Sequence, residues 1–436
     1  MGGFDLLIYG CKILPMNVEG IIENGVIAIK NGKISRIGRR GTYEEMHAEY
    51  EIDAEGKIAM PGLVNCHTHV AMTLFRGLAE DKPLNVWLKD VIWPLEARLK
   101  SDDVYVGALL GCLEMIKSGT TCFADMYFYE EAVARAVFES GLRAVLAEGI
   151  IESGNRALGE RTFIRSVNFA KSFNGYAEGR VTTMLGPHAV YSLSRELLEN
   201  VFVKAFELGV GVHMHLAESW EMFKDFENRY GCSEVEFLDK IGFFGRVVAA
   251  HCLNLSDVDR RILAERRVNV VYVPVANMKL GLGAARVREL LDLGVNVALG
   301  TDGPASNNTL DMFETMKVGV LLQKLNYLSP EVFSPYQVLR MATVYGAQAL
   351  GIEKDVGTLE VGKRADIILV DVSKPHLRPL HNVYASLVYS ACRSDVDTVI
   401  VDGKILMENR RVKTLDEGAV MDLADRKAEE LLTRKS

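Results

Sequence analysis

The sequence lacks the cysteine spacings and glycine-rich motifs that define several classes of protein. Its seven cysteines are odd in number and scattered between positions 11 and 392, with no Cys-x-x-Cys pair, which excludes a disulfide framework or a zinc ribbon. Neither Gly-x-Gly-x-x-Gly after a predicted strand nor Gly-x-x-x-x-Gly-Lys-Ser/Thr occurs. A nucleotide-phosphate fold therefore loses its main sequence support.

Long apolar runs and blocks of one charge are also missing. No apolar stretch approaches the roughly 18 residues that span a bilayer, and no basic region precedes an apolar run at the start of the chain. We therefore expect a cytoplasmic protein with no membrane partner. The 50 Lys and Arg residues against 58 Asp and Glu residues give a net charge of −8, and without a basic block we expect no nucleic-acid partner.

What the 436 residues do contain is the pattern of an α/β protein with strands at both ends. Strand-forming runs flank the turn signals Asn31-Gly32 and Asp402-Gly403, which favour tight hairpins. Between these ends, β-type runs alternate with helical patterns, which is typical of βα units around a parallel sheet. Eight such runs are present, at 58–64, 120–125, 142–146, 181–186, 210–216, 247–251, 268–273 and 295–300.

Eight runs fit a closed barrel better than an open doubly wound sheet. The predicted fold class is therefore α/β, a (β/α)8 barrel of the TIM type with a small β-sandwich domain built from both chain ends. The predicted domains are residues 1–57 for the N-terminal part of the sandwich, 58–355 for the catalytic barrel, and 356–436 for the C-terminal part of the sandwich. A surface helix is expected near the end, over 416–435.

Six of the nine histidines lie at or near the ends of these runs, where a barrel of this type carries its chemistry. His67 and His69 are two residues apart, so on an extended strand both side chains point to the same face. His213 shares a strand face with His215 one layer lower, and we interpret it as a core residue. The remaining strand-end residues with metal-ligating side chains are His188, His251 and Asp302.

Three imidazoles and one carboxylate suit Zn²⁺, with Fe²⁺ or Mn²⁺ as alternatives, and leave room for a water. Such a metal makes water a nucleophile at neutral pH, provided that a nearby group handles its proton. Glu218 and His251 are the candidates for that proton transfer, although Glu218 could instead be a carboxylate that starts a helix. Two other zinc signatures are incomplete: His47-Ala48-Glu49 has no Pro-Cys-x-x-Cys partner, and no His-Glu-x-x-His occurs.

Residues 61–69, PGLVNCHTH, together with the later His215, His251 and Asp302, resemble the amidohydrolase superfamily. The resemblance covers nearly the whole chain. Within the superfamily, the chain is similar to the 5-methylthioadenosine/S-adenosylhomocysteine deaminases. The segments that carry this similarity are 72–77, 87–88, 93–96, 125–128, 186–188, 215–218, 300–303 and 306–308.

The resemblance implies one divalent metal per subunit, because the run that ends with Phe123-Ala124-Asp125 has no lysine to bridge a second one. The implied ligands are His67, His69, His215 and Asp302.

The resemblance also implies where a nucleoside would bind. Glu96 would hold the two ribose hydroxyls, His188 and Glu218 would face the purine, and Trp87 would form a wall. Arg161 would lie toward the 5′ substituent, with a solvated loop arginine as the alternative.

The implied reaction is hydrolytic deamination of an adenine nucleoside at C6. Glu218 would protonate ring N1, and Asp302, which also binds substrate, would take the proton of the metal-activated water with His251 orienting it. The substrates considered are 5′-methylthioadenosine, S-adenosylhomocysteine, 5′-deoxyadenosine and adenosine. The alternatives are a triazine chlorohydrolase or aminohydrolase, a guanine or cytosine deaminase, and a non-catalytic scaffold.

Two segments depart from the family pattern. Residues 272–280 replace the usual His-Asn-Pro-x-Ser-Asn, and Glu148 stands where some relatives have an arginine. The sequence therefore leaves open the rim of the site and the preferred 5′ substituent, and it also leaves open the native metal and whether the chain forms a homo-oligomer.

Overall fold

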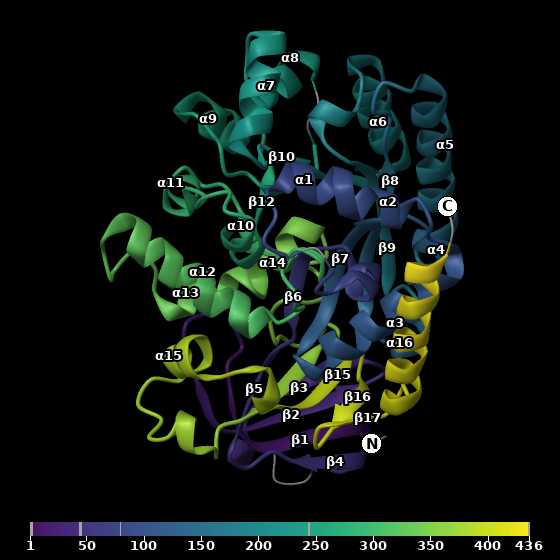
Figure 1. The fold of residues 1–436 in the computed structure, drawn as a ribbon. Helices are drawn as coiled ribbons and strands as arrows, with labels where there is room; N and C mark the ends of the chain where they lie inside the picture. Colours follow the sequence, from purple (N-terminus) through teal and green to yellow (C-terminus); the bar gives the residue numbers. More distant parts are fainter. Residues whose placement is uncertain (1–2, 43–45, 79, 243–244, 435–436) are drawn as a thin grey trace.

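A computed structural model describes residues 3–42, 46–78, 80–242 and 245–434, and it shows a barrel beside a mixed sheet (Figure 1). Eight parallel strands follow one another in chain order from β6 to β13, which confirms the predicted barrel. Nearly every residue in them is buried, as expected for strands covered on both faces. They are β6 (Leu63–Thr68), β7 (Thr120–Tyr127), β8 (Arg143–Ile150), β9 (Val181–Pro187), β10 (Gly211–Leu216), β11 (Val247–His251), β12 (Asn269–Tyr272) and β13 (Val297–Leu299).

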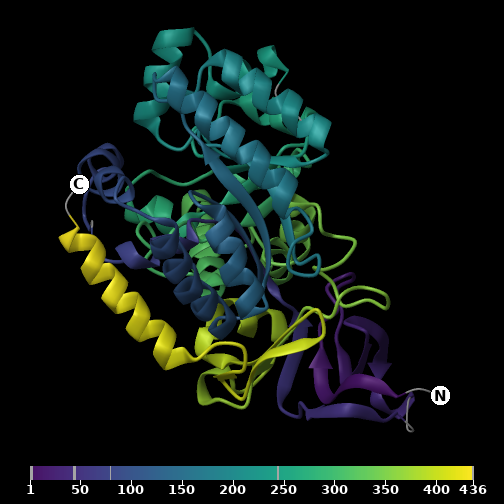
Figure 2. The ribbon, with the colours of Figure 1, turned by 90° about the vertical axis from the view of Figure 1, so that its right-hand side faces the viewer.

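Helices connect these strands and cover the outside of the barrel (Figure 2). Several begin at a serine whose hydroxyl accepts a backbone N–H three residues later, as at Ser194 and Ser256, which is a typical N-cap. No helix of the described ranges is long and apolar enough to cross a membrane. The helices are α1 (Leu84–Val86), α2 (Trp93–Glu96), α3 (Ser101–Lys117), α4 (Glu130–Ser140), α5 (Arg156–Phe173), α6 (Arg195–Leu208), α7 (Trp220–Tyr230), α8 (Glu234–Ile241), α9 (Asp257–Glu265), α10 (Pro274–Lys279), α11 (Val287–Asp292), α12 (Met312–Tyr327), α13 (Pro335–Met341), α14 (Val344–Leu350), α15 (Val383–Ala385) and α16 (Glu417–Thr433).

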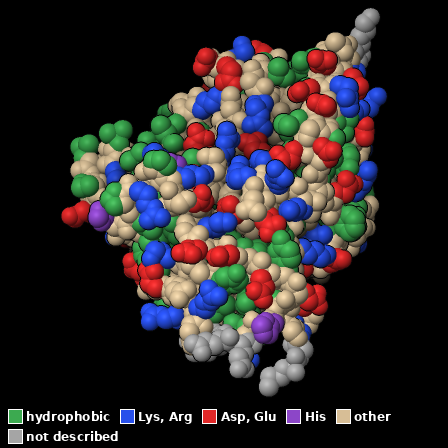
Figure 3. Space-filling view, turned by 90° about the horizontal axis from the view of Figure 1, so that it is seen from below, with side chains coloured by type: hydrophobic (Ala, Val, Ile, Leu, Met, Phe, Trp, Pro, Cys, Tyr) green, Lys and Arg blue, Asp and Glu red, His purple; other side chains and the backbone are tan. Residues whose placement is uncertain are grey.

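The small domain is a nine-stranded mixed sheet made from both ends of the chain, in the order β17-β16-β15-β14-β5-β1-β2-β3, with β4 paired to β1. Asn31 and Asp402 adopt the left-handed backbone that the two predicted hairpin turns require. Seen from below, acidic and basic side chains are interspersed over the described surface (Figure 3). The strands are β1 (Phe4–Ile13), β2 (Ile22–Lys30), β3 (Lys33–Arg39), β4 (Ala48–Asp53), β5 (Lys57–Pro61), β14 (Ile367–Asp371), β15 (Val396–Val401), β16 (Lys404–Glu408) and β17 (Arg411–Val412).

The expected first barrel strand, 58–64, is in fact two strands that belong to different sheets. β5 pairs with β1 and β14 of the mixed sheet, whereas β6 pairs with β7 of the barrel. The break falls at Gly62, where an added Cβ would lie 2.0 Å from the Thr121 hydroxyl oxygen. The chain therefore passes from one sheet to the other at a point too close-packed for a side chain. The domain division at residues 57 and 355 stays a prediction.

The crossing at Gly62 gives a stability prediction. Gly62→Ala is expected to lower the free energy of unfolding by about 1–3 kcal/mol, because the new methyl group overpacks against Thr121. Urea unfolding measures the change. Gly20→Ala is the matched control, since no atom lies within 4 Å of the Cβ added there, and an equal loss in both variants would contradict the prediction.

Hydrogen bonds from β6 to the loop after β13 close the seam of the barrel. The Asn65 side chain donates to the Thr301 hydroxyl at 2.7 Å and accepts the Thr301 N–H at 3.0 Å. The backbone N–H of Asp302 donates to the His67 carbonyl at 3.0 Å. These bonds hold His67, from the first barrel strand, close to Asp302, which follows the last one; both are predicted metal ligands.

Candidate active site

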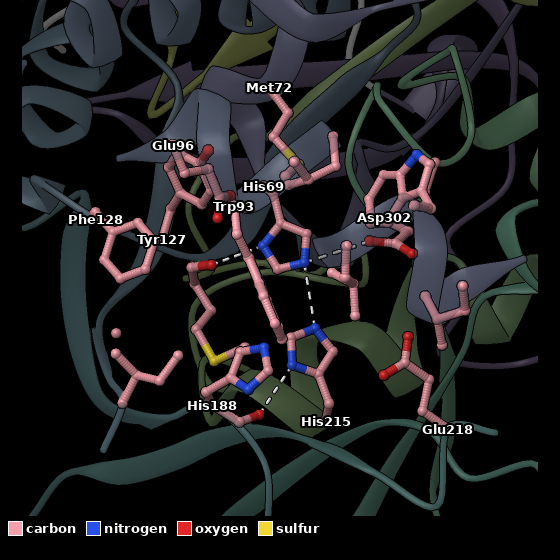
Figure 4. Close-up of a pocket in the computed structure, with 18 of the residues that line it drawn as sticks. His69, Met72, Trp93, Glu96, Tyr127, Phe128, His188, His215, Glu218 and Asp302 are labelled. Atoms are coloured by element: carbon pink, nitrogen blue, oxygen red, sulfur yellow. Dashed lines mark hydrogen bonds and ion pairs between the residues drawn. The ribbon is translucent and has the colours of Figure 1, made fainter. Parts of the chain in front are cut away.

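Three of the four predicted metal ligands, His69, His215 and Asp302, line one cavity at the carboxyl ends of the barrel strands (Figure 4), and the buried His67 lies beside them. His69 Nε2 is 3.2 Å from His215 Nε2 and 3.4 Å from an Asp302 carboxylate oxygen. His67 Nε2 lies 3.7 Å from the same Asp302 oxygen. Ligand atoms of the three histidines all lie within 4.8 Å of one another. Residues more than 230 positions apart thus form a His-rich potential metal site.

The outward-facing nitrogens of two of these histidines are held by backbone carbonyls. His69 Nδ1 donates to the Met126 carbonyl at 2.7 Å, and His215 Nδ1 donates to the His188 carbonyl at 2.9 Å. A proton on Nδ1 leaves Nε2 with a free lone pair, which is the form that binds a metal. The two Nε2 atoms that lie 3.2 Å apart therefore face each other as acceptors, a contact that a shared cation relieves.

His67 fits a metal for the same reason. Its Nδ1 lies 2.9 Å from Nε2 of His213, and its Nε2 is buried without a hydrogen-bond partner in the described structure. Burial, and then the neighbouring imidazoles, hold the pKa of His67 well below its ordinary value, so the ring is neutral. His213 is buried, as predicted, and in addition supports His67 from behind.

Glu218 and His251 lie beside these ligands. His251 Nε2 is 3.7 Å from a Glu218 carboxylate oxygen, and His251 Nδ1 donates to the Asn277 side-chain oxygen at 2.9 Å. Burial raises the pKa of the Glu218 carboxyl, although the neighbouring His251 opposes the shift. Glu218 is therefore biased toward its protonated form, which can donate a proton.

Several residues at this end of the barrel, Cys252 among them, have an unusual backbone. Ala217, His251 and Asp302 have φ angles of 50°, 73° and 66°, in the left-handed region that non-glycine residues rarely adopt. Such strain costs of the order of 1–3 kcal/mol per residue and clusters at functional sites. Here it turns the chain directly after β10, within the end of β11 and after β13, where the side chains must converge.

A second carboxylate lies on the opposite wall of the cavity. Glu96, at the end of α2, faces the Tyr127 hydroxyl and is separated from Glu218 by the histidines (Figure 4). Burial raises the pKa of Glu96 to about 7, against the opposing effects of Tyr127 and His69. Trp87 and Trp93 also line the cavity, so it offers aromatic walls and two well-separated acidic groups.

Comparison with known proteins identifies the family. The model of the "Amidohydrolase family" matches residues 58–406. The chain belongs to the amidohydrolase family. This confirms the resemblance inferred from the strand-end histidines.

Relatives of this amidohydrolase match over almost its full length. A protein of Methanosarcina acetivorans named 5′-deoxyadenosine deaminase is 50% identical over 432 residues, which cover 99% of each chain. A protein of Pelotomaculum thermopropionicum named 5-methylthioadenosine/S-adenosylhomocysteine deaminase is 47% identical over 434 residues, covering 99% of this chain and 100% of the other. The crystal structure of an adenosine deaminase from Xanthomonas campestris with bound zinc has a TM-score of 0.95 and 32% identity, with 99% of each chain covered.

The structure does not bring Arg161 to the cavity of this amidohydrolase. Arg161 is exposed on α5 and is not among the residues that line the cavity, so its predicted contact with a 5′ substituent has no support here. Glu148, which stands where some relatives have an arginine, pairs with Arg165, whose Nε lies 2.9 Å from a Glu148 oxygen. Its guanidinium also lies over the Tyr129 ring at 4.4 Å.

Sequence reasoning missed several residues that build the site. Asn277 lies in segment 272–280, which departs from the family pattern, yet its side-chain oxygen accepts a hydrogen bond from His251. Tyr272, from the same segment, does not line the cavity. It is buried, and its hydroxyl accepts a hydrogen bond from the Gln323 side chain at 3.0 Å. Trp93 could have been found, because it lies three residues before Glu96 and such residues share a helix face.

Proposed function

We propose that this amidohydrolase hydrolyses the 6-amino group of adenine nucleosides and releases ammonia and the inosine analogue. The observation that carries the proposal is the pair of carboxyl groups on opposite walls of one cavity, with the histidine cluster between them. One carboxyl can serve a purine and the other a ribose. The substrate is therefore a small molecule; the predictions of no nucleic acid, no membrane and an open oligomeric state remain predictions.

His67, His69 and His215 would hold one divalent metal through Nε2, with Asp302 as the fourth ligand. The nitrogen and oxygen donors suit Zn²⁺ and also accept Fe²⁺ or Mn²⁺; zinc is favoured because the related Xanthomonas structure contains it. When bound, such a metal lowers the pKa of water and so supplies a nucleophile at neutral pH.

The chain's own residues would move the protons. Glu218, biased toward its protonated form by burial, would donate to ring N1 and make C6 electrophilic. Asp302 would take the proton of the attacking water, and His251, held by Asn277, would orient that water. General acid and base steps of this kind each contribute about 10² to 10⁴ in rate. His188, which donates its backbone N–H to Ile150 and lies in the cavity wall, would contact the purine.

On the opposite wall Glu96 would accept hydrogen bonds from both ribose hydroxyls. Trp87 and Trp93, which line the same cavity, would pack against the nucleoside. This arrangement suits a substrate with a sugar, and a triazine has no diol to use it.

The far end of the cavity suits a short, uncharged 5′ substituent. Phe128 lies beside Glu96 and Tyr127, on the side away from Asp302 and Glu218 (Figure 4). Ile150 and Ile151 line the same cavity, and its described lining includes no lysine or arginine. A charged amino-acid extension that packs against this wall would lose water without gaining an opposite charge, whereas Lys89 and Arg229 line the adjoining cavity on the other side, which shares Trp93 and Leu280 with this one.

An ultraviolet assay of the conversion of adenine to hypoxanthine tests the proposal. We expect deamination of 5′-deoxyadenosine and 5′-methylthioadenosine, with a kcat/KM at least about tenfold higher than for S-adenosylhomocysteine, because the carboxylate and ammonium of the latter lack partners. Adenosine is the control for a small polar 5′ group. No conversion of any of the four nucleosides would contradict the function, and equal values for all four would contradict only the preference.

A further inference from the structure

Two short turns, one near each end of the connection between β14 and β15, bring together a second set of metal-ligating side chains. His376 lies in the turn Pro375–Leu377, and Cys392 precedes the turn Arg393–Asp395 that ends at Asp395. One nitrogen, one sulfur and one carboxylate oxygen of these residues lie within 4.8 Å of one another. None of the three lines the catalytic cavity.

One carboxylate oxygen is the centre of this cluster. Asp395 Oδ2 accepts hydrogen bonds from His376 Nε2 at 2.9 Å, from the Cys392 backbone N–H at 2.9 Å and from the Cys392 thiol at 3.3 Å. Three donors from the two turns therefore converge on one oxygen of a buried carboxylate.

We propose that His376 Nε2, Cys392 Sγ and Asp395 Oδ2 form a second divalent-metal site, suited to Zn²⁺ and separate from the catalytic one. Imidazole, thiolate and carboxylate are all common zinc ligands, and three of them leave a fourth tetrahedral position for water. The thiolate and the carboxylate supply two negative charges, one of which is shared with the Lys374 ammonium. Lys374 binds the other Asp395 oxygen, Oδ1, at 2.9 Å, so it does not have to leave.

The observed separations are close to those that a zinc ion imposes. Ordinary zinc bond lengths place tetrahedral ligands about 3.4 to 3.6 Å apart, against 2.9 Å for the nitrogen–oxygen pair and 3.3 Å for the sulfur–oxygen pair here. Relative to Asp395 Oδ2, the His376 nitrogen and the Cys392 sulfur therefore need to move outward by only a few tenths of an ångström, and the nitrogen and the sulfur lie within 4.8 Å of each other. Both residues are exposed, whereas Asp395 is buried, so the two ligands that must shift face solvent.

The surrounding backbone is already held in place. The Arg410 guanidinium donates to the carbonyl oxygens of Arg393 at 2.9 Å and Val396 at 2.8 Å. An ion bound here would join the two ends of the connection 372–395. That connection reaches the loop between β1 and β2 through Tyr384, whose hydroxyl donates to the Gly20 carbonyl at 3.0 Å. We therefore assign the ion a structural role.

Cobalt substitution of the full-length chain tests the proposal. The catalytic ligands are nitrogen and oxygen atoms only, and the six other cysteines are buried, so a thiolate-to-cobalt charge-transfer band in the near ultraviolet reports the second site alone. After removal of metal with a chelator and addition of excess Co²⁺, we expect this band and two bound cobalt ions per chain.

Matched variants separate the two sites. Cys392→Ser is expected to abolish the band, to leave one cobalt per chain and to retain full deaminase activity, whereas Cys232→Ser, at a buried cysteine, keeps the band. His376→Ala is expected to weaken cobalt binding at the second site, followed by titration of the band, by at least about tenfold. Loss of a residue that only hydrogen-bonds to a metal ligand already lowers metal affinity by that much. Absence of the band in the wild-type chain, or a band that survives Cys392→Ser, would overturn the proposal.

Discussion

Replacing Glu218 by glutamine is expected to lower kcat for adenine nucleosides by at least about 10², with no change in metal content. The amide keeps the size of the side chain but has no acidic proton to give to ring N1. Glu218 lies 3.7 Å from His251 and outside the predicted ligand set, so metal binding does not depend on it. Steady-state assays and metal analysis of the same preparation measure both quantities.

A control and a pH profile make this test specific. Glu227→Gln, at a half-exposed carboxylate on α7 paired with Lys224, is expected to leave kcat unchanged. Because burial raises the pKa of Glu218, its acid form is lost only as the pH rises through that raised value, so the wild-type rate should fall on the alkaline side. The glutamine variant should lack that fall, and near-normal turnover by it would refute the assignment of Glu218 as the acid.

Glu96→Ala is expected to lower kcat/KM for nucleosides by about 10² to 10⁴. The carboxylate would accept two hydrogen bonds from the ribose diol, and hydrogen bonds to a charged group are each worth about 1.5–3 kcal/mol. Glu96 lines the cavity, and burial raises the pKa of its carboxyl to about 7, so the full effect is expected above that pH, where the carboxylate is charged. Kinetics with 5′-deoxyadenosine measure the loss.

A substrate without the diol separates binding from damage to the fold. With 2′,3′-dideoxyadenosine, wild type and Glu96→Ala should have similar kcat/KM values, since neither can form the diol contacts. If this chain were instead a triazine hydrolase, Glu96→Ala would barely affect its activity on a triazine. If Glu96→Ala were as active as wild type on 5′-deoxyadenosine, the ribose assignment would be wrong.

The barrel and its histidine cluster were predictable because their signals are local. The end of a buried run marks the carboxyl end of a strand, and parallel strands bring such ends to one edge of a barrel. That alone placed His67, His69 and His215 near Asp302. The hairpins at Asn31-Gly32 and Asp402-Gly403 were predictable for a similar reason, because the two central residues of a tight hairpin determine the type of turn.

Other features depend on contacts between distant segments and left no local signal. The run 58–64 reads as one strand, and only the approach of Thr121 at Gly62 shows where it divides. The support of His251 by Asn277 and of His67 by His213 depends on how β11 and β10 pack. Arg161 was assigned from the family resemblance, whereas on α5 it is exposed. The left-handed backbone at His251 and Asp302 is imposed by the tertiary structure.

One ion shared by four side chains is the centre of the proposed site, and X-ray diffraction recorded on both sides of the zinc absorption edge tests it most directly. Crystals of the zinc-loaded chain should show an anomalous peak about 2.0–2.2 Å from Nε2 of each of the three histidines His67, His69 and His215 and from an Asp302 oxygen. A peak that any one of these four side chains fails to reach, or no peak between them, would contradict the account.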